Sequence, residues 1–395
     1  MELTNFIKDI CNYNYDMLTQ VLESEPYNLK VKQDLETPEL FLIHNTDKSN
    51  VSLKIVRECN GIILEKNTFK ILCYTFDKCS DSETFDKTIN LDNLYVEKTT
   101  EGTLVRLFYY NNQWRLSSKK CINAYKSKWL SEKNFGLLFE ECINYNEIVT
   151  KLDINYCYSF IITHPENRMV VRYLQPIVYH ISTRDLRSLS EIYINIDVQK
   201  TIREFINKDN LEEFINNNIT NNNILNLQTV INHEGYIFID NNFNRQKVRT
   251  PIFNKVRNLW GNTNNRFYRY LELRCDVNTL NEYLTYFDDD KEQFLEYEKR
   301  IGTIAQNILE LYISKHIKKE NIKIPYFFSK IIYNLHGDFI KNKVVTNYNK
   351  IMLVLLETPP KKIMFMINHL IKYNNHLNNP ENAVDNELIE EQMEL

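Results

Sequence analysis

Residues 97–105 read Glu97-Lys98-Thr99-Thr100-Glu101-Gly102-Thr103-Leu104-Val105. The segment from Thr103 to Tyr110 has the composition of a β-strand. Successive side chains of a strand point to opposite faces, so the side chains of Lys98 and Thr99 are expected to point in opposite directions. Asn111-Asn112 then predicts a tight hairpin turn into a second strand.

Three further segments belong with this stretch, and each combines charged residues with a short apolar run. The cations Lys247 and Arg249 occupy alternate positions, so they are expected to project to one face of a strand and neutralise a phosphate. The segments are Asn60-Gly61-Ile62-Ile63-Leu64 with Phe76-Asp77-Lys78; Phe160 to Arg168, which ends His164-Pro165-Glu166-Asn167-Arg168, with Val170-Val171-Arg172-Tyr173; and Glu234-Gly235-Tyr236-Ile237 with Lys247-Val248-Arg249-Thr250-Pro251.

In this order the segments resemble the motifs of phage-type and giant-virus ATP-dependent RNA ligases, over residues 40 to 260. Residues 97–105 are similar to the family's nucleophile motif Lys-x-Asp-Gly-Ser-Leu, whose lysine attacks the α-phosphate of ATP and forms a phosphoramidate. The resemblance implies an α+β fold, in which a ligase-type nucleotidyltransferase domain with antiparallel sheets precedes an all-helical domain. It also implies ATP and Mg²⁺ as cofactors and RNA as a partner.

The resemblance assigns roles to individual residues. Lys98 is the lysine available as the nucleophile, and Glu234 is the catalytic carboxylate that holds the metal ion or its waters. The residues implied in binding the nucleotide or its phosphates are Lys78, Lys119 in Ser117-Ser118-Lys119, Asn167, Arg168, Lys247 and Arg249.

The chain departs from the family pattern at three positions. When Glu101-Gly102 is aligned with Asp-Gly, Thr99 takes the nucleophile position, and Lys98 reaches the same pocket only through a local bulge. Ile161 occupies the position of a carboxylate that would orient the ribose. Arg249 replaces a lysine, which keeps the charge and alters the geometry. Threonine cannot form the lysyl phosphoramidate, so the sequence favours a descendant that has lost catalysis.

The composition narrows the classes of protein further. The formal net charge is −4, so attraction to nucleic acid requires a local basic patch. The eight cysteines form no CxxC pair, which fits a reducing compartment and argues against structural zinc. We expect no signal peptide and no membrane span, because the N-terminus is charged and no long apolar run occurs. The expected location is the cytoplasm, either of a host cell or in a virus factory.

The expected organisation has four parts. Residues 1–38 are a helical segment, with an amphipathic helix from Leu3 to Glu25, and residues 39–262 form the ligase-like domain. Val198 to Asn216 is expected to be helical and Leu225 to Ile231 a strand. Residues 263–378 are a helical domain, and residues 379–395 are an acidic tail, expected to be disordered.

Three functions remain in competition at this point. The first is a catalytically degenerate module that binds an RNA end, a cap or a nucleotide, in viral RNA metabolism or translation. The second is an active RNA ligase that uses Lys98. The third is a structural subunit of an RNA-processing assembly, with the helical domain contacting a protein partner. Lysines of that domain, interleaved with Tyr326, Phe327, Phe328 and Tyr333, are candidates for contact with a phosphate backbone, although basic helix faces over an aromatic interior are the better explanation of the pattern.

Overall fold

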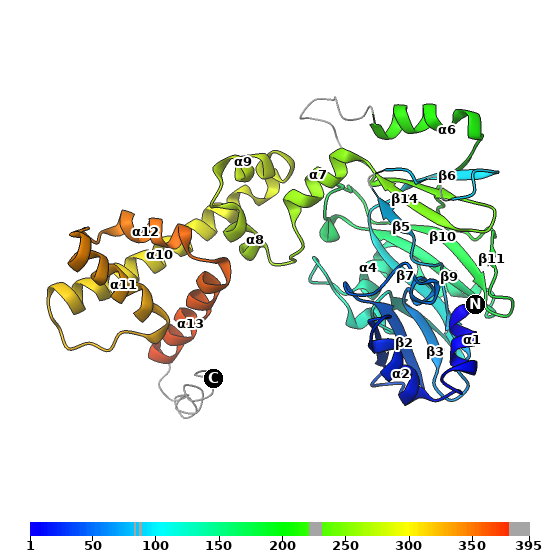
Figure 1. The fold of residues 1–395 in the computed structure, drawn as a ribbon, viewed down its shortest axis with the longest axis horizontal. Helices are drawn as coiled ribbons and strands as arrows, with labels where there is room; N and C mark the ends of the chain where they lie inside the picture. Colours follow the sequence, from blue (N-terminus) through cyan, green and yellow to red (C-terminus); the bar gives the residue numbers. More distant parts are fainter. Residues whose placement is uncertain (83, 87–88, 221–230, 379–395) are drawn as a thin grey trace. The chain divides into compact units, whose positions relative to one another are not determined.

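The computed structural model describes residues 1–378 except 83, 87–88 and 221–230. The expected strand from Leu225 to Ile231 lies almost wholly outside the described residues, and the expected acidic tail lies wholly outside them. The chain divides into two compact units, Met1–Asn258 and Leu259–Leu395. The first unit contains all the described strands, and the described part of the second is helical, which confirms the α+β class (Figure 1).

A four-stranded antiparallel sheet, the small sheet, follows the first two helices and has the order β1-β2-β3-β4. Its apolar residues, among them Leu40, Leu42 and Ile63, pack against Phe108 and Cys157 of the next sheet. The elements are α1 (Glu2–Asp9), α2 (Tyr15–Glu23), β1 (Leu29–Gln33), β2 (Leu40–Asn45), α3 (Lys54–Glu58), β3 (Ile62–Glu65) and β4 (Ile71–Cys73).

A five-stranded sheet, the core sheet, has the order β11-β10-β9-β7-β8. One face carries Tyr158, Phe160 and Ile162, which pack against Leu138 and Phe139 of α4. The other face meets the small sheet. The elements are β7 (Thr103–Tyr110), β8 (Gln113–Ser118), α4 (Phe135–Cys142), α5 (Tyr145–Thr150), β9 (Tyr156–Thr163), β10 (Ile177–Asp185) and β11 (Glu191–Ile192).

A second five-stranded sheet, the site sheet, has the order β12-β6-β13-β14-β5. One face is covered by α6, where Leu211 packs against Leu94, Val96, Phe238 and Val248. The other face turns towards the core sheet. The elements are β5 (Ser80–Ser82), β6 (Leu94–Thr99), β12 (Arg203–Ile206), α6 (Lys208–Ile215), β13 (Gly235–Ile239) and β14 (Arg245–Arg249).

The second unit is a bundle whose interior is rich in stacked aromatic rings, such as Tyr283 on Phe294 at 5.4 Å between ring centroids. Within the described residues, no helix is sufficiently long and apolar to cross a membrane. The elements are α7 (Pro251–Trp260), which crosses the boundary between the units, α8 (Arg266–Leu273), α9 (Val277–Tyr286), α10 (Lys291–Tyr312), α11 (Tyr326–Asn342), α12 (Tyr348–Glu357) and α13 (Pro360–Asn378).

Two expectations about local structure were wrong. The single helix expected from Leu3 to Glu25 is two helices, because Asn12 and Tyr13 take positive φ values of 45° and 55° and reverse the chain. The helix expected from Val198 to Asn216 holds strand β12 and the shorter helix α6, because Arg203 to Ile206 pair with the edge of β6.

Candidate nucleotide-binding site

Strand β6 of the site sheet presents Thr99 and Lys98 to opposite faces. Leu94 and Val96, which share the parity of Lys98, lie in the apolar core under α6. Lys98 stands at the exposed end of that face, whereas Thr99 is only 5% exposed on the face that turns towards the core sheet. The strand contains no bulge here, because Thr99 pairs with Gly235 and Lys98 with Tyr236 in regular register.

Lys247 and Arg249 of β14 share the face of Thr99. Gly235 pairs with Thr99 on one side and with Arg249 on the other, and Ile237 pairs with Lys247. Residues directly opposite each other in antiparallel strands lie on the same face. The alternate spacing of Lys247 and Arg249 therefore brings both cations beside the nucleophile position.

Glu234 joins these two cations. One carboxylate oxygen lies 2.5 Å from Nζ of Lys247, and the other accepts a hydrogen bond from Nε of Arg249 at 2.8 Å. Burial acts to raise the pKa of Glu234, but the two cations outweigh it and hold the pKa below its ordinary value. The group is a compact, ion-paired cluster on one face of the sheet, as the sequence pattern predicts.

The glycines of the two motifs are required by close backbone packing. A Cβ atom added to Gly102 would lie 2.4 Å from the carbonyl oxygen of Ile162, and one added to Gly235 would lie 2.1 Å from that of Val248. No side chain fits at either position. The two Glu-Gly sequences therefore have a structural role, in addition to any role of their carboxylates.

Glu101 links the central stretch to the third segment. Its Oε2 accepts hydrogen bonds from the backbone N–H groups of Val170 and Val171, at 2.9 and 2.7 Å, and its carbonyl oxygen accepts one from the Tyr173 hydroxyl at 2.6 Å. Burial raises the pKa of this carboxyl group, whose Oε1 has no hydrogen-bond partner among the described residues. Asn167 adds a second link, because its amide donates to Thr103 at 2.8 Å.

The other residues predicted to bind phosphate are less closely tied to the cluster. Lys119 follows β8, and burial together with the nearby charge of Lys78 lowers the pKa of Lys119 to about 8. Arg168 directly follows the short 3-10 turn that contains Asn167.

Ile161, at the position of the expected carboxylate, lies on the core sheet and pairs with Leu104 and Tyr179. It shares a face with Ser159, which pairs with Ser182. An apolar side chain there supplies no acceptor for a ribose hydroxyl.

Further charged residues between the sheets were not singled out from the sequence. Arg245 of β14 donates to Glu191 of β11 at 2.8 Å, which ties the site sheet to the core sheet. Arg203 pairs with Glu97 at 2.5 Å, and Glu97 also accepts from the Thr201 hydroxyl at 2.9 Å. Glu97 has the same parity in β6 as Thr99, so strand alternation alone predicts its face. The sequence did not indicate a position for Arg203 at the site, because the segment that contains it was expected to be helical.

A small pocket lies between these sheets, beside the ion pairs. Its lining includes Glu97 and Arg203 of the site sheet and Ser182 and Glu191 of the core sheet. The hydroxyl of Ser182 is buried and has no hydrogen-bond partner among the described residues. The pocket therefore has polar walls, and its volume of about 20 Å³ has room for about one water molecule.

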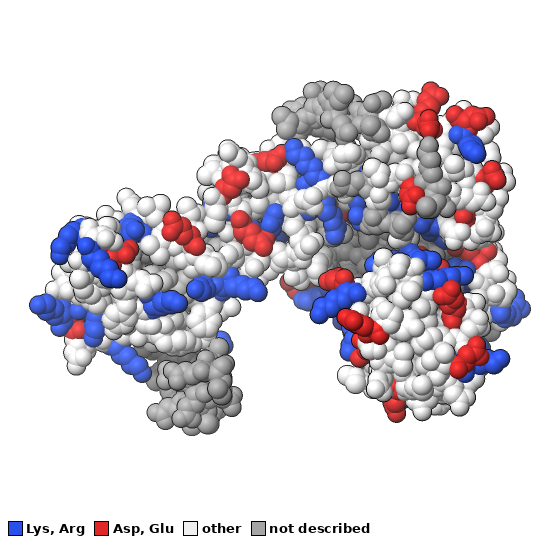
Figure 2. Space-filling model, viewed as in Figure 1, with Lys and Arg blue, Asp and Glu red and all other residues white. Residues whose placement is uncertain are grey.

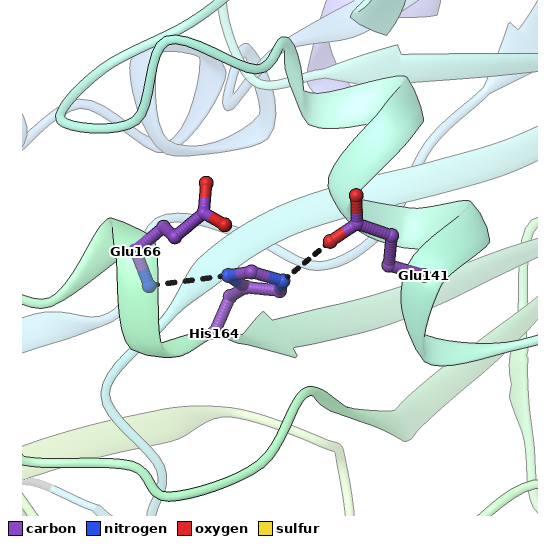
Figure 3. A group of neighbouring side chains, drawn as sticks. All are labelled: Glu141, His164 and Glu166. Carbon is purple, nitrogen blue, oxygen red and sulfur yellow. Dashed lines mark hydrogen bonds and ion pairs between the residues drawn. The ribbon is translucent and has the colours of Figure 1, made fainter.

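A separate cluster of Glu141, His164 and Glu166 has the residue types of a metal site (Figure 3). The backbone N–H of Glu166 donates to Nδ1 of His164 at 3.2 Å, which leaves Nε2 to donate its proton to Glu141 at 2.9 Å. Lys133 already lies between the carboxylates, at 2.9 Å from Glu141 and 2.8 Å from Glu166. Because both ring nitrogens are engaged and a cation is present, this network fixes the turn that carries Asn167.

Comparisons with known proteins find viral relatives and solved ligase structures. No family model matches the chain. Two proteins named immediate-early protein ICP-46 homolog are similar to it: that of Invertebrate iridescent virus 3 is 26% identical over 42% of this chain and 41% of its own length, and that of Invertebrate iridescent virus 6 is 25% identical over 72% and 68%. The chain thus spans less than half of the first relative.

A third relative comes from Autographa californica nuclear polyhedrosis virus, where it is named as a candidate bifunctional polynucleotide kinase/RNA ligase. It is 20% identical over 41% of this chain and 26% of its own length. Among solved structures, an archaeal ATP-dependent RNA ligase aligns with a TM-score of 0.42 and 10% identity over 71% of this chain and 77% of its own. The order of the motifs and their convergence between the two sheets define the class: the first unit has a ligase-type nucleotidyltransferase fold.

Proposed function

We propose that the first unit binds a nucleotide, or the nucleotide at an RNA end or cap, without forming a covalent lysyl intermediate. The observation that supports this is the position of Thr99. It stands on the face shared by Lys247 and Arg249, where the family pattern has the attacking lysine, and Lys98 points away from that face. A threonine hydroxyl cannot replace the amine in a phosphoramidate.

The binding step that we propose is an exchange of anions. In the free protein Glu234 neutralises Lys247 and Arg249. The phosphates of a nucleotide carry more negative charge than the carboxylate and are stronger hydrogen-bond acceptors, so they can replace it as the partner of these cations. Once released from the cations, Glu234 offers carboxylate oxygens, which are the ligands that Mg²⁺ prefers. Mg²⁺ would supply further neutralisation of the phosphate charge, so this residue set fits ATP with Mg²⁺.

The alternative of an active ligase that uses Lys98 requires the lysine to cross to the other face of β6. The regular pairing of Lys98 with Tyr236 opposes that movement, because it would break the register between β6 and β13. The third candidate, a structural subunit with no ligand, is separated from the first two by a binding measurement.

The experiment combines covalent labelling with equilibrium binding. The purified protein is incubated with α-labelled ATP or GTP and Mg²⁺, denatured, and examined for retained label, beside Lys98→Ala. We expect no retained label, together with reversible binding of nucleotide that Lys247→Ala weakens and Lys98→Ala leaves unchanged. Label that disappears in Lys98→Ala establishes the active ligase. The absence of both label and binding leaves only the structural subunit.

A further inference from the structure

The last helices of the second unit carry a concentrated positive charge. Between residues 313 and 378 there are lysines at 315, 318, 319, 323, 330, 341, 343, 350, 361, 362 and 372, no arginine, and only Glu320, Asp338 and Glu357 as acidic residues. Figure 2 shows Lys and Arg side chains spread over the visible face of this unit. The whole chain has a net charge of −4, so the basic residues are segregated here.

Most of these lysines form no ion pair with the residues that the structure describes. Within the described part of this region, the ion pairs are Lys318 with Glu320 at 3.8 Å and Lys350 with Asp338 at 3.9 Å. Unbalanced positive charge on a folded surface attracts a polyanion. Lysine is a compact point charge that does not grip a carboxylate in the two-pronged manner of arginine, so it suits non-specific contact with phosphates.

One face of α11 combines such lysines with exposed aromatic rings. Tyr326, Lys330, Tyr333, Gly337 and Lys341 follow each other at intervals of four, three, four and four residues, which places them on one face of a helix. Tyr326 and Tyr333 are 51% and 54% exposed. The buried residues of α11, such as Phe328 and Leu335, occupy the opposite face.

Gly337 has no close neighbour among the described residues. Each of the other six glycines has a heavy atom 3.0 Å or less from the position that a Cβ would take, but Gly337 has nothing within 4 Å. Glycine weakens the interior of a helix relative to almost any other residue. In a chain with only seven glycines, one placed in the middle of an exposed helix face points to a partner that approaches the backbone closely.

We propose that this face of α11 binds single-stranded RNA, with the sugar–phosphate backbone passing over Gly337 between Lys330 and Lys341, and with bases stacking on Tyr333 and Tyr326. Bases stack on aromatic side chains without regard to sequence, and lysines follow the backbone. A protein partner fits less well, because lysine is depleted from the centres of protein–protein interfaces. The inference deepens the proposed function, since it gives an RNA-end-binding protein a second surface for its strand.

The test measures fluorescence anisotropy of a labelled single-stranded oligouridylate with the full chain across a series of salt concentrations. The double variant Lys330→Glu/Lys341→Glu should bind about tenfold or more weakly, and the slope of log affinity against log salt should fall by about 1.4. Gly337→Gln should also weaken binding although it keeps the charge, because its side chain fills the path of the backbone. Since glutamine is a better helix former than glycine, this variant should fold at least as stably.

The matched control is Lys291→Glu/Lys299→Glu, which makes the same change of charge at exposed positions of α10. Equal losses of affinity in the control and in the α11 double variant would overturn the inference, as would wild-type affinity in Gly337→Gln. A wild-type dimer that Gly337→Gln dissociates would overturn it in favour of a protein interface. ATP binding, measured separately with Lys247→Ala, reports on the proposed function alone, so either proposal can fail without the other.

Discussion

The backbone N–H of Glu234 donates a hydrogen bond to the carbonyl oxygen of Thr99 at 2.9 Å. The residue that pairs with Lys247 and Arg249 is therefore fixed directly to the position where the family pattern has its nucleophile. This contact is made by backbone atoms, so it does not depend on which side chain occupies position 99. The proposed binding site therefore keeps its geometry whichever residue stands at position 99.

The first prediction follows from that geometry. Thr99→Lys places an amine on the face shared by Lys247 and Arg249, whose positive charges lower the pKa of a neighbouring lysine and favour its reactive form. We expect the variant to retain label from α-labelled ATP and Mg²⁺ after denaturation, whereas the wild type retains none. Acid-labile, base-stable label would identify the phosphoramidate.

The control for this gain of function is the double variant Thr99→Lys/Lys98→Ala. If label comes from position 99, removal of Lys98 leaves it unchanged. Label that depends on Lys98 would contradict our assignment of the two faces of β6. Because a lysine replaces a buried threonine, the thermal stability of the variant must be measured alongside, so that a failure to fold is not scored as a lack of label.

The second prediction concerns acid. The pKa of Glu234 is lowered in the folded protein, so its ion pairs stabilise the fold above the ordinary pKa of a glutamate, and this contribution is lost as pH falls through the lowered value. Glu234→Gln should cost about 1–3 kcal/mol near neutral pH, because it removes the buried carboxylate that Lys247 and Arg249 both contact. The difference in unfolding free energy between wild type and variant should shrink below pH 4.5, the ordinary value. A difference that stays constant from neutral to acid pH would contradict the ion pairing.

The convergence of Glu234, Lys247 and Arg249 could be predicted from the sequence because it depends on a local rule. Two residues at alternate positions of a strand share a face, and a glycine that tolerates close packing brings the neighbouring strand alongside. The separation of Lys98 from Thr99 follows from the same rule. The fold class was equally accessible, because runs of strand pattern end before Pro251 and helical pattern dominates after it.

The remaining parts of the site depend on contacts between segments distant in sequence. Arg203 reaches Glu97 across 106 residues, and Arg245 reaches Glu191 across 54. The periodicity within each segment does not predict such a pairing. The break at Asn12 and Tyr13 was missed for a related reason: the apolar spacing from Leu3 to Glu25 suits a helix throughout, and only the packing of the two shorter helices favours the reversal.

The third prediction tests the hairpin between β7 and β8. Asn111 and Asn112 have φ values of 49° and 59°, the two consecutive left-handed residues of a type I′ turn, as expected from the sequence. Glycine takes this conformation at least as readily as asparagine. Asn112→Gly should therefore preserve or raise the unfolding free energy, by up to about 0.5 kcal/mol, whereas Asn112→Val should lower it by about 1 kcal/mol or more. Urea denaturation of both variants measures these unfolding free energies. An Asn112→Val variant as stable as the wild type would exclude the type I′ turn.

The last prediction concerns Lys119. Burial, reinforced by the charge of Lys78, lowers the pKa of Lys119 to about 8, from an ordinary 10.5. Between these values the unfolded chain binds more protons than the folded one, so this lysine makes the fold more stable as pH rises from 8 towards 10.5. Lys119→Met removes the charge but keeps much of the side-chain volume. The variant should lack that part of the rise in urea midpoint, and the exposed Lys120→Met serves as its control.

The same residue connects stability to binding. If Lys119 contacts the phosphates of a bound nucleotide, the anion restores the charged form of the amine, and the complex takes up a proton at pH 8. Calorimetric titrations in two buffers with different ionisation enthalpies would show this uptake as a difference in the apparent binding enthalpy. The difference should disappear in Lys119→Met and persist in Lys120→Met. An apparent enthalpy independent of the buffer in the wild type would place Lys119 outside the phosphate site, and would leave Lys247 and Arg249 as its cations.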